Sequence, residues 1–270
     1  MIRNYDKLIF ELSKEGRVGY SLPKKQVEGY CMCCGLPENL KRESKPELPE
    51  VTEFDVVRHY TNLSNKNFGV DTGFYPLGSC TMKYNPKINE EIAAHPGFAG
   101  LHPLQPDHTV QGALWVYDHL SKALSAITGM AEFTLNPFAG AHGELTGLMV
   151  IRQYHISRGD LKRTKVIVPD SAHGTNPASA AMAGFSIVLV GCDENGNINV
   201  EELREKATAN AENLAGLMIT YPSTHGVFEV QIREICNIIH QNGGLVYMDG
   251  ANMNAQVGLT NPGFIGADVC

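Results

Sequence analysis

Short apolar runs bounded by turn residues recur through the second half of the chain. Such runs are typical of strands buried on both faces of a sheet. They predict strands at 165–169, 186–190, 217–221 and 245–248, a strand-like segment at 133–135, and the start of a further strand at 267–270.

Apolar residues at helical spacing predict helices between these strands. The clearest example is 109–128, which Gly129 terminates; the other predicted helices are 140–155, 200–207 and 230–241. Asn176 and Pro177 read as the N-cap and first residue of one more helix, over Ala-rich 178–183. The alternation favours an α/β fold, a mostly parallel sheet with helices on both faces.

The first third of the chain has a different composition. We expect 1–95 to form an N-terminal arm and loop-rich segment, with one helix near 52–63, and 96–270 to form the large domain. The prolines and glycines of 95–106 predict a second loop without regular structure.

The long loop 71–86 carries a thiol, two hydroxyls and a cation. Ser79, Cys80, Thr81 and Lys83 could hold a substrate carboxylate; the alternative is a packed surface loop.

Charge and cysteine content exclude several classes of protein. The 270 residues carry a net charge of −7 and a pI near 5.8, which argues against a nucleic-acid partner. No apolar stretch approaches the length of a membrane span and the N-terminus does not look like a signal peptide, so we expect a cytoplasmic protein with no membrane partner. The dense cluster Cys31, Cys33 and Cys34 lacks a second ligand pair, so no metal site is predicted.

Small and polar residues follow the predicted strands. Gly140, Ala141 and His142 open a helix, where exposed backbone N–H groups form an anion site that a phosphate would fit. His173 follows the strand 165–169 and could lay its ring against a flat ligand, although a lone histidine is more often a core or cap residue.

Two later strands end in the same way. Thr224 could donate a hydrogen bond to a ring substituent. Asp249 could pair with a protonated ring nitrogen while Ala251 leaves room for the ring face; the alternative is an aspartate that caps the next turn. Ligands bind at this edge of open α/β sheets, and the combination predicts pyridoxal 5′-phosphate (PLP) as an electron sink.

Longer motifs span most of the chain. They are Asp71-Thr-Gly-Phe-Tyr-Pro-Leu-Gly-Ser-Cys-Thr-Met-Lys-Tyr-Asn-Pro86, Gly97-Phe-Ala-Gly-Leu-His-Pro103, Gly140-Ala-His-Gly-Glu144, Asp170-Ser-Ala-His-Gly-Thr-Asn-Pro177 and Tyr247-Met-Asp-Gly-Ala-Asn-Met-Asn-Ala255. Together they resemble the P-protein of the glycine cleavage system, glycine decarboxylase, and specifically the second subunit of its two-subunit bacterial form.

The resemblance implies a PLP-dependent transferase of fold type I. It places the turn that begins at Gly140 at the phosphate, His173 and Ala251 on the two ring faces, and Asp249 at the ring nitrogen. It also implies glycine as substrate, transfer of the aminomethyl group to the lipoyl arm of H-protein, and a homologous P-protein subunit 1 in a heterotetramer.

The resemblance also implies a Schiff-base lysine shortly after the Asp-Gly-Ala motif. No lysine follows Lys206, and neither Lys206 nor Lys165 is well placed for the role. We therefore expect that lysine and the C-terminal part of the fold to lie beyond Cys270, and this segment to be inactive alone. Another fold type I enzyme, such as an aminotransferase or cysteine desulfurase, and a non-catalytic scaffold subunit stay open as alternatives.

Overall fold

A computed structural model describes residues 7–21, 24, 35–73 and 84–270 of the chain. The backbone contacts divide the chain into two units, Met1–Asn89 and Glu90–Cys270. The residues predicted at the carboxyl edge of the sheet all belong to the second unit.

The first unit is built around one helix. Its elements are η1 (Ile9–Leu12), η2 (Glu38–Leu40) and α1 (Glu53–Ser64), with α2 (Lys87–Ala93) at its boundary. The helix predicted near 52–63 is α1, and Thr52 caps it: its hydroxyl accepts from the Asp55 N–H, and the Asp55 carboxylate accepts from the Thr52 N–H. Arg17 pairs with Asp55 at 2.9 Å, which fastens the segment before it to this helix start.

The second unit alternates helices and strands. Its helices are α3 (Pro96–Ala99), η3 (Asp107–Thr109), α4 (Gln111–Thr128), α5 (Gly140–Ser157), α6 (Thr175–Met182), α7 (Val200–Ala209), α8 (Ile232–Gln241), η4 (Met253–Ala255) and α9 (Pro262–Ile265). Its strands are β1 (Lys165–Pro169), β2 (Ser186–Val190), β3 (Leu214–Thr220) and β4 (Leu245–Asp249).

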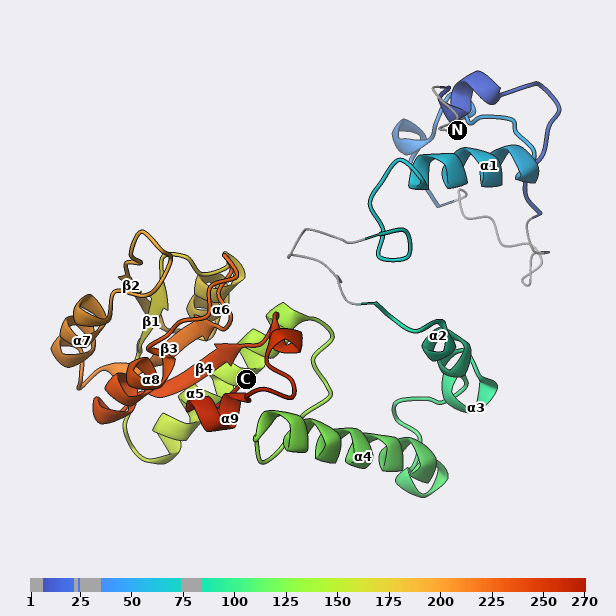
Figure 1. The fold of residues 1–270 in the computed structure, drawn as a ribbon. Coiled ribbons are helices and arrows are strands. Elements are labelled where there is room, and N and C mark those ends of the chain that lie inside the picture. The colour runs from blue at the N-terminus through green and yellow to red at the C-terminus, as the bar shows by residue number, and fades with distance from the viewer. Residues whose placement is uncertain (1–6, 22–23, 25–34, 74–83) are drawn as a thin grey trace. The chain divides into compact units, whose positions relative to one another are not determined.

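The four strands form one parallel sheet in the order β2-β1-β3-β4. Helices cover both faces (Figure 1). Alternate strand residues enter two separate cores. The core shared with α7 and α8 contains Ile167, Leu217, Ile219, Val246 and Met248. The core shared with α5 and α6 contains Val166, Val168, Met218 and Tyr247. The α/β fold with a helical layer on each face is therefore confirmed.

Helix α5 lies unusually close to β4 at Gly147. A Cβ placed there would come within 2.5 Å of the Tyr247 ring and 3.0 Å of Val269. Only glycine permits this approach, and the buried Tyr247 ring fills the space that a side chain would need.

Three local predictions are wrong. Residues 133–135 form no strand, because a short apolar run takes strand geometry only when a neighbour supplies hydrogen bonds, and the described sheet does not include it. The loop 95–106 contains α3, which Pro96 starts at the N1 position that proline favours. Gly174, and not Asn176, is the N-cap of α6.

The predicted start of a strand at 267–270 does lie beside β4. Tyr247 and Val269 form one parallel bridge, and the Met248 N–H donates to the Val269 carbonyl at 2.8 Å. In the described part of the chain, no helix combines the length and apolar character that crossing a membrane requires.

Candidate functional site

The carboxyl ends of the strands share one edge of the sheet. β1 leads into the loop that carries His173, β3 leads into the loop that carries Thr224, and β4 ends at Asp249. In a parallel sheet this edge also receives the N-termini of the helices that cover it, here α5 and α6. The fold therefore gathers the predicted residues at the edge where such sheets bind ligands.

Asp249 is half-buried and both of its carboxylate oxygens are engaged. Oδ2 accepts from Asn176 Nδ2 at 3.1 Å, and Oδ1 accepts from the Ala251 N–H at 3.0 Å. The second bond closes a turn, so the capping alternative describes part of what Asp249 does. Ala251 itself is exposed.

From the sequence, Asn176 was predicted to be a helix N-cap, but the structure gives it another role. Its side chain is fully buried, and its Oδ1 accepts from Thr220 Oγ1 at 3.3 Å. It thus links the end of β3 to the carboxylate at the end of β4. A pairing across 73 residues leaves no signal in the local pattern of the sequence.

His173 is exposed, and its ring is tied to the protein on one side. Nδ1 lies 2.7 Å from Thr175 Oγ1, and that hydroxyl donates to Glu144 Oε1 at 2.7 Å. Glu144 is buried and its second oxygen accepts from Ser179 Oγ at 2.8 Å. The core alternative does not describe the exposed ring of His173, but the Thr175 N–H at the start of α6 donates to Nδ1 at 3.3 Å, so the cap alternative describes part of its role. Glu144 and Thr175 were missed.

Tyr247 on β4 is buried. Burial, followed by the negative charges of Asp249 and Glu144, raises the pKa of the Tyr247 hydroxyl. Tyr247 therefore stays neutral beneath the candidate site at physiological pH.

The start of α5 has the features of an anion site. Gly140, Ala141 and His142 are all exposed, and Ala139 at the N-cap offers no side-chain hydrogen bond to the first turn. A Cβ placed at Gly140 or Gly143 would meet no atom within 4 Å. The His142 N–H donates to the Ala139 carbonyl at 3.0 Å, while the open space at Gly140 and the lack of a side-chain cap fit a phosphate at this helix N-terminus.

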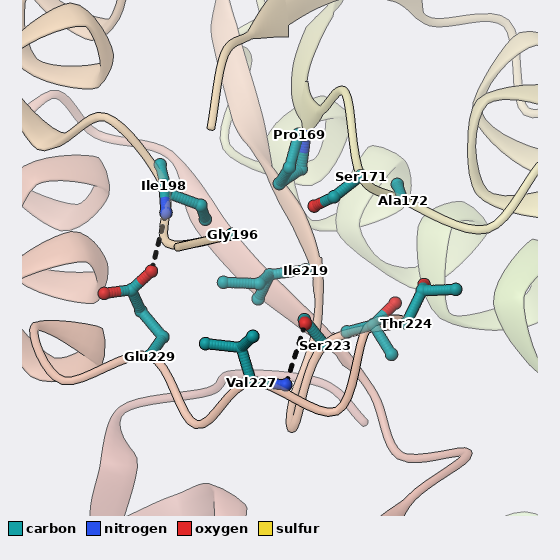
Figure 2. Close-up of a pocket in the computed structure, with 11 residues that line it drawn as sticks. Pro169, Ser171, Ala172, Gly196, Ile198, Ile219, Ser223, Thr224, Val227 and Glu229 are labelled. Atoms are coloured by element: carbon teal, nitrogen blue, oxygen red, sulfur yellow. Dashed lines mark hydrogen bonds between the residues drawn. The ribbon is translucent and has the colours of Figure 1, made fainter. Parts of the chain in front are cut away.

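Thr224 lines a small pocket beside this edge. Figure 2 shows Thr224 and Ser223 on the loop after β3, with Ser171 and Ala172 on the loop after β1. The buried Glu229 carboxylate accepts from the Ile198 N–H at 2.7 Å and so fixes the far end of the Thr224 loop.

The two lysines considered above are engaged elsewhere. Lys165 Nζ donates to Asn210 Oδ1 at 2.8 Å, at the amino-terminal end of β1. Lys206 Nζ donates to the Leu189 carbonyl at 2.6 Å and pairs with Glu202. Lys165 therefore lies at the opposite end of the strands from Asp249, and Lys206 bonds to β2, which β1 and β3 separate from β4.

Two predicted groups fall outside the described residues. They are the substrate-loop residues Ser79, Cys80, Thr81 and Lys83, and the cluster Cys31, Cys33 and Cys34. Among the residues that are described, no group of three or more His, Cys, Asp or Glu side chains could hold a metal ion.

Sequence relatives match the chain from end to end. A protein of Alkaliphilus oremlandii is 58% identical over 269 residues, which is 100% of this chain and 55% of that protein. A protein of Caldanaerobacter subterraneus is 59% identical over 269 residues, and one of Thermococcus onnurineus is 56% identical over 266 residues. The matched regions make up 55% and 51% of those two proteins. All three are named probable glycine dehydrogenase (decarboxylating) subunit 2. The chain is homologous to this subunit 2 family.

The chain spans about half the length of the curated relatives it matches. No family model matches it. Among solved structures, a glycine decarboxylase (P-protein) of the glycine cleavage system in inhibitor-bound form superposes with a TM-score of 0.63 at 19% identity, covering 87% of this chain and 51% of that one. A sphingosine-1-phosphate lyase of Burkholderia pseudomallei gives 0.56 at 15% identity, covering 84% and 56%. The fold is that of the PLP-dependent fold type I enzymes.

Proposed function

We propose that the protein takes part in PLP-dependent glycine decarboxylation, with transfer of the aminomethyl group to the lipoyl arm of H-protein. Its partners in this reaction would be glycine, the lipoylated H-protein and a homologous P-protein subunit 1. The proposal rests on the names of the subunit 2 relatives together with one observation, the Asp249 carboxylate that buried Asn176 holds at the end of β4.

The residues of the sheet edge fit the cofactor. The N–H groups at the start of α5, from Gly140 to His142, would bind the phosphate. His173 and Ala251 would lie against the two faces of the ring, and Thr224 would donate to a ring substituent. Asp249 would hold a proton on the ring nitrogen.

When bound, PLP supplies an electron sink for the carbon that loses CO₂. The contribution of Asp249 is electrostatic: its negative charge, held in place by the Asn176 N–H, keeps the ring nitrogen protonated. The turn N–H of Ala251 engages the other carboxylate oxygen, so the group cannot rotate away from the site.

We propose that two contributions come from outside the described site. The lysine that carries the cofactor would lie outside these 270 residues, which would leave this segment inactive alone. Ser79, Cys80, Thr81 and Lys83 would hold the carboxylate of glycine. In this organisation 96–270 is the cofactor-binding large domain and 1–95 is the arm.

The test is Asp249→Asn in the protein at the length its cell produces. We expect glycine-dependent CO₂ exchange with lipoylated H-protein to fall at least ~10²-fold, in line with the loss of a preorganised charged partner. Asp193→Asn is the matched control, because Asp193 Oδ1 also closes a turn by accepting from the N–H two residues on, at 2.9 Å. An unchanged rate in Asp249→Asn would refute the role of Asp249 and favour a non-catalytic scaffold subunit.

A further inference from the structure

A buried carboxylate stands behind the exposed histidine of the site. Glu144 is only 6% exposed and lies on α5, 31 residues before Thr175. Its two oxygens accept from two hydroxyls of α6, Thr175 Oγ1 at 2.7 Å and Ser179 Oγ at 2.8 Å. Thr175 continues the chain of hydrogen bonds to His173.

Counting protons limits how this chain can be arranged. Thr175 Oγ1 carries one hydrogen but has two partners at 2.7 Å, Glu144 Oε1 and His173 Nδ1. If the hydroxyl donates to Glu144, Nδ1 must carry a proton and donate to the hydroxyl. If the hydroxyl donates to Nδ1, the carboxyl group of Glu144 must be protonated and donate to the hydroxyl.

The Ser179 hydroxyl favours the arrangement in which Thr175 donates to Glu144 and Nδ1 carries a proton. Ser179 already donates to Oε2, and an ionised carboxylate is an acceptor at both oxygens. Hydrogen bonds from two hydroxyls stabilise the charged form of a buried carboxylate, and charge-assisted bonds of this kind are stronger than neutral ones. The Thr175 N–H donates to Nδ1 at 3.3 Å, a bond that requires an unprotonated Nδ1, but it is 0.6 Å longer than the 2.7 Å contact between Nδ1 and Thr175 Oγ1 and therefore the weaker of the two.

We propose that Glu144 is a positioning residue that acts through Thr175 on His173. It fixes the orientation of the imidazole and keeps its neutral form protonated on Nδ1, with Nε2 unprotonated. An exposed ring without this support would rotate between rotamers and tautomers, and ordering it would weaken ligand binding. The benefit to PLP rests on the function proposed above, whereas the tautomer does not.

The tautomer is measured by NMR of the full-length protein without PLP, labelled with ¹⁵N at its histidine rings and with His173 assigned from a His173→Gln variant. In the wild type we expect the neutral ring of His173 to show the shift of a protonated nitrogen at Nδ1 and of an unprotonated one at Nε2. A ring protonated at Nε2 overturns the proposal.

Three variants test the route through Thr175. Thr175→Val removes the hydroxyl at nearly constant volume and should leave the two tautomers of His173 mixed. Thr175→Ser restores the hydroxyl and should restore the single tautomer. Ser179→Ala removes the other hydrogen bond that favours the ionised Glu144 and should leave His173 less uniformly protonated on Nδ1 than in the wild type. A Thr175→Val spectrum identical to the wild type overturns the proposal.

PLP affinity, measured by absorbance titration, separates this proposal from the proposed function. We expect Thr175→Val to weaken PLP binding by about 3- to 10-fold, the effect of one hydrogen bond, and Thr175→Ser to recover it. A changed tautomer with unchanged PLP affinity overturns the positioning role. The effect of Asp249→Asn on glycine-dependent CO₂ exchange tests the proposed function separately.

Discussion

The close approach of α5 to β4 makes Gly147→Ala a sensitive perturbation of the site. The new methyl group would lie 2.5 Å from Tyr247 Cε2 and 2.8 Å from Cδ2, about 1 Å inside ordinary carbon–carbon contact. Tyr247 is buried at 5% exposure, and Val269 closes the remaining side at 3.0 Å. The ring cannot turn away, so the helix and the strand must separate.

The magnitude follows from two opposing effects. Overpacking a well-packed core costs about 1–3 kcal/mol. Replacing glycine by alanine within a helix returns up to about 1 kcal/mol of helix propensity. Gly143→Ala is the matched control, because it lies on the same helix and its Cβ would meet no atom within 4 Å. Between the two variants the propensity gain largely cancels, so their free energies of unfolding should differ by about 1–3 kcal/mol.

Urea unfolding followed by circular dichroism measures this difference, after refolding has been shown to be reversible. Gly143→Ala should be as stable as the wild type or slightly more stable, and Gly147→Ala should be less stable than either. Because α5 begins at the proposed phosphate site and β4 ends at Asp249, Gly147→Ala should also weaken PLP binding. Equal stability of the two variants would refute the argument from close approach.

Two further predictions concern buried polar side chains. Asn176→Ala removes the partner of both Thr220 Oγ1 and Asp249 Oδ2, and the free energy of unfolding in urea should fall by about 1–3 kcal/mol. His155 is buried with Nε2 2.8 Å from the Ala215 carbonyl, and burial lowers the pKa of its ring below the ordinary 6.5. Because the unfolded chain then binds the extra proton, the stability that His155 contributes is complete above pH 6.5 and is lost as the pH falls below it, so the urea midpoint should fall between pH 7 and pH 5.

Each of these predictions has its own control. Asn210→Ala also removes an asparagine side chain with two partners, the Lys206 carbonyl and Lys165 Nζ, but Asn210 is only half-buried, so the change should cost less than Asn176→Ala. His155→Gln keeps a donor for the Ala215 carbonyl without a titrating ring, so its midpoint should fall less on acidification. Equal effects within either pair would contradict the corresponding argument.

The local patterns in the sequence predicted the frame of the second unit well. The strands 165–169 and 186–190 match β1 and β2 at both ends, and 245–248 falls one residue short of β4. For β1 and β4 those patterns succeed because a strand covered on both faces must be apolar along most of its length, a requirement that any single segment displays on its own. β2, at the edge of the sheet, is apolar although Ile187 and Leu189 are exposed.

The residues that hold the site in place could not be predicted from local sequence patterns. Asn176 has the residue type and the following proline of an N-cap, and only the fold reveals that its amide reaches Asp249 instead. Glu144 lies within a recognised motif, yet its partner Thr175 is 31 residues away. Both roles depend on which helices the sheet brings together, and that information is absent from a short stretch of sequence.

The strand order also determines when each strand of the sheet can pair while the chain is being synthesised on the ribosome. β3 is the third strand to be synthesised, but it is the strand that joins β1 to β4. At synthesis rates of about 5–20 residues per second, roughly 2–6 s pass between completion of Val190 and of Thr220. During that time the inner edge of β1 offers unpaired N–H and carbonyl groups to any other extended chain nearby. The nascent protein therefore needs shielding most during these seconds, well before the candidate site exists.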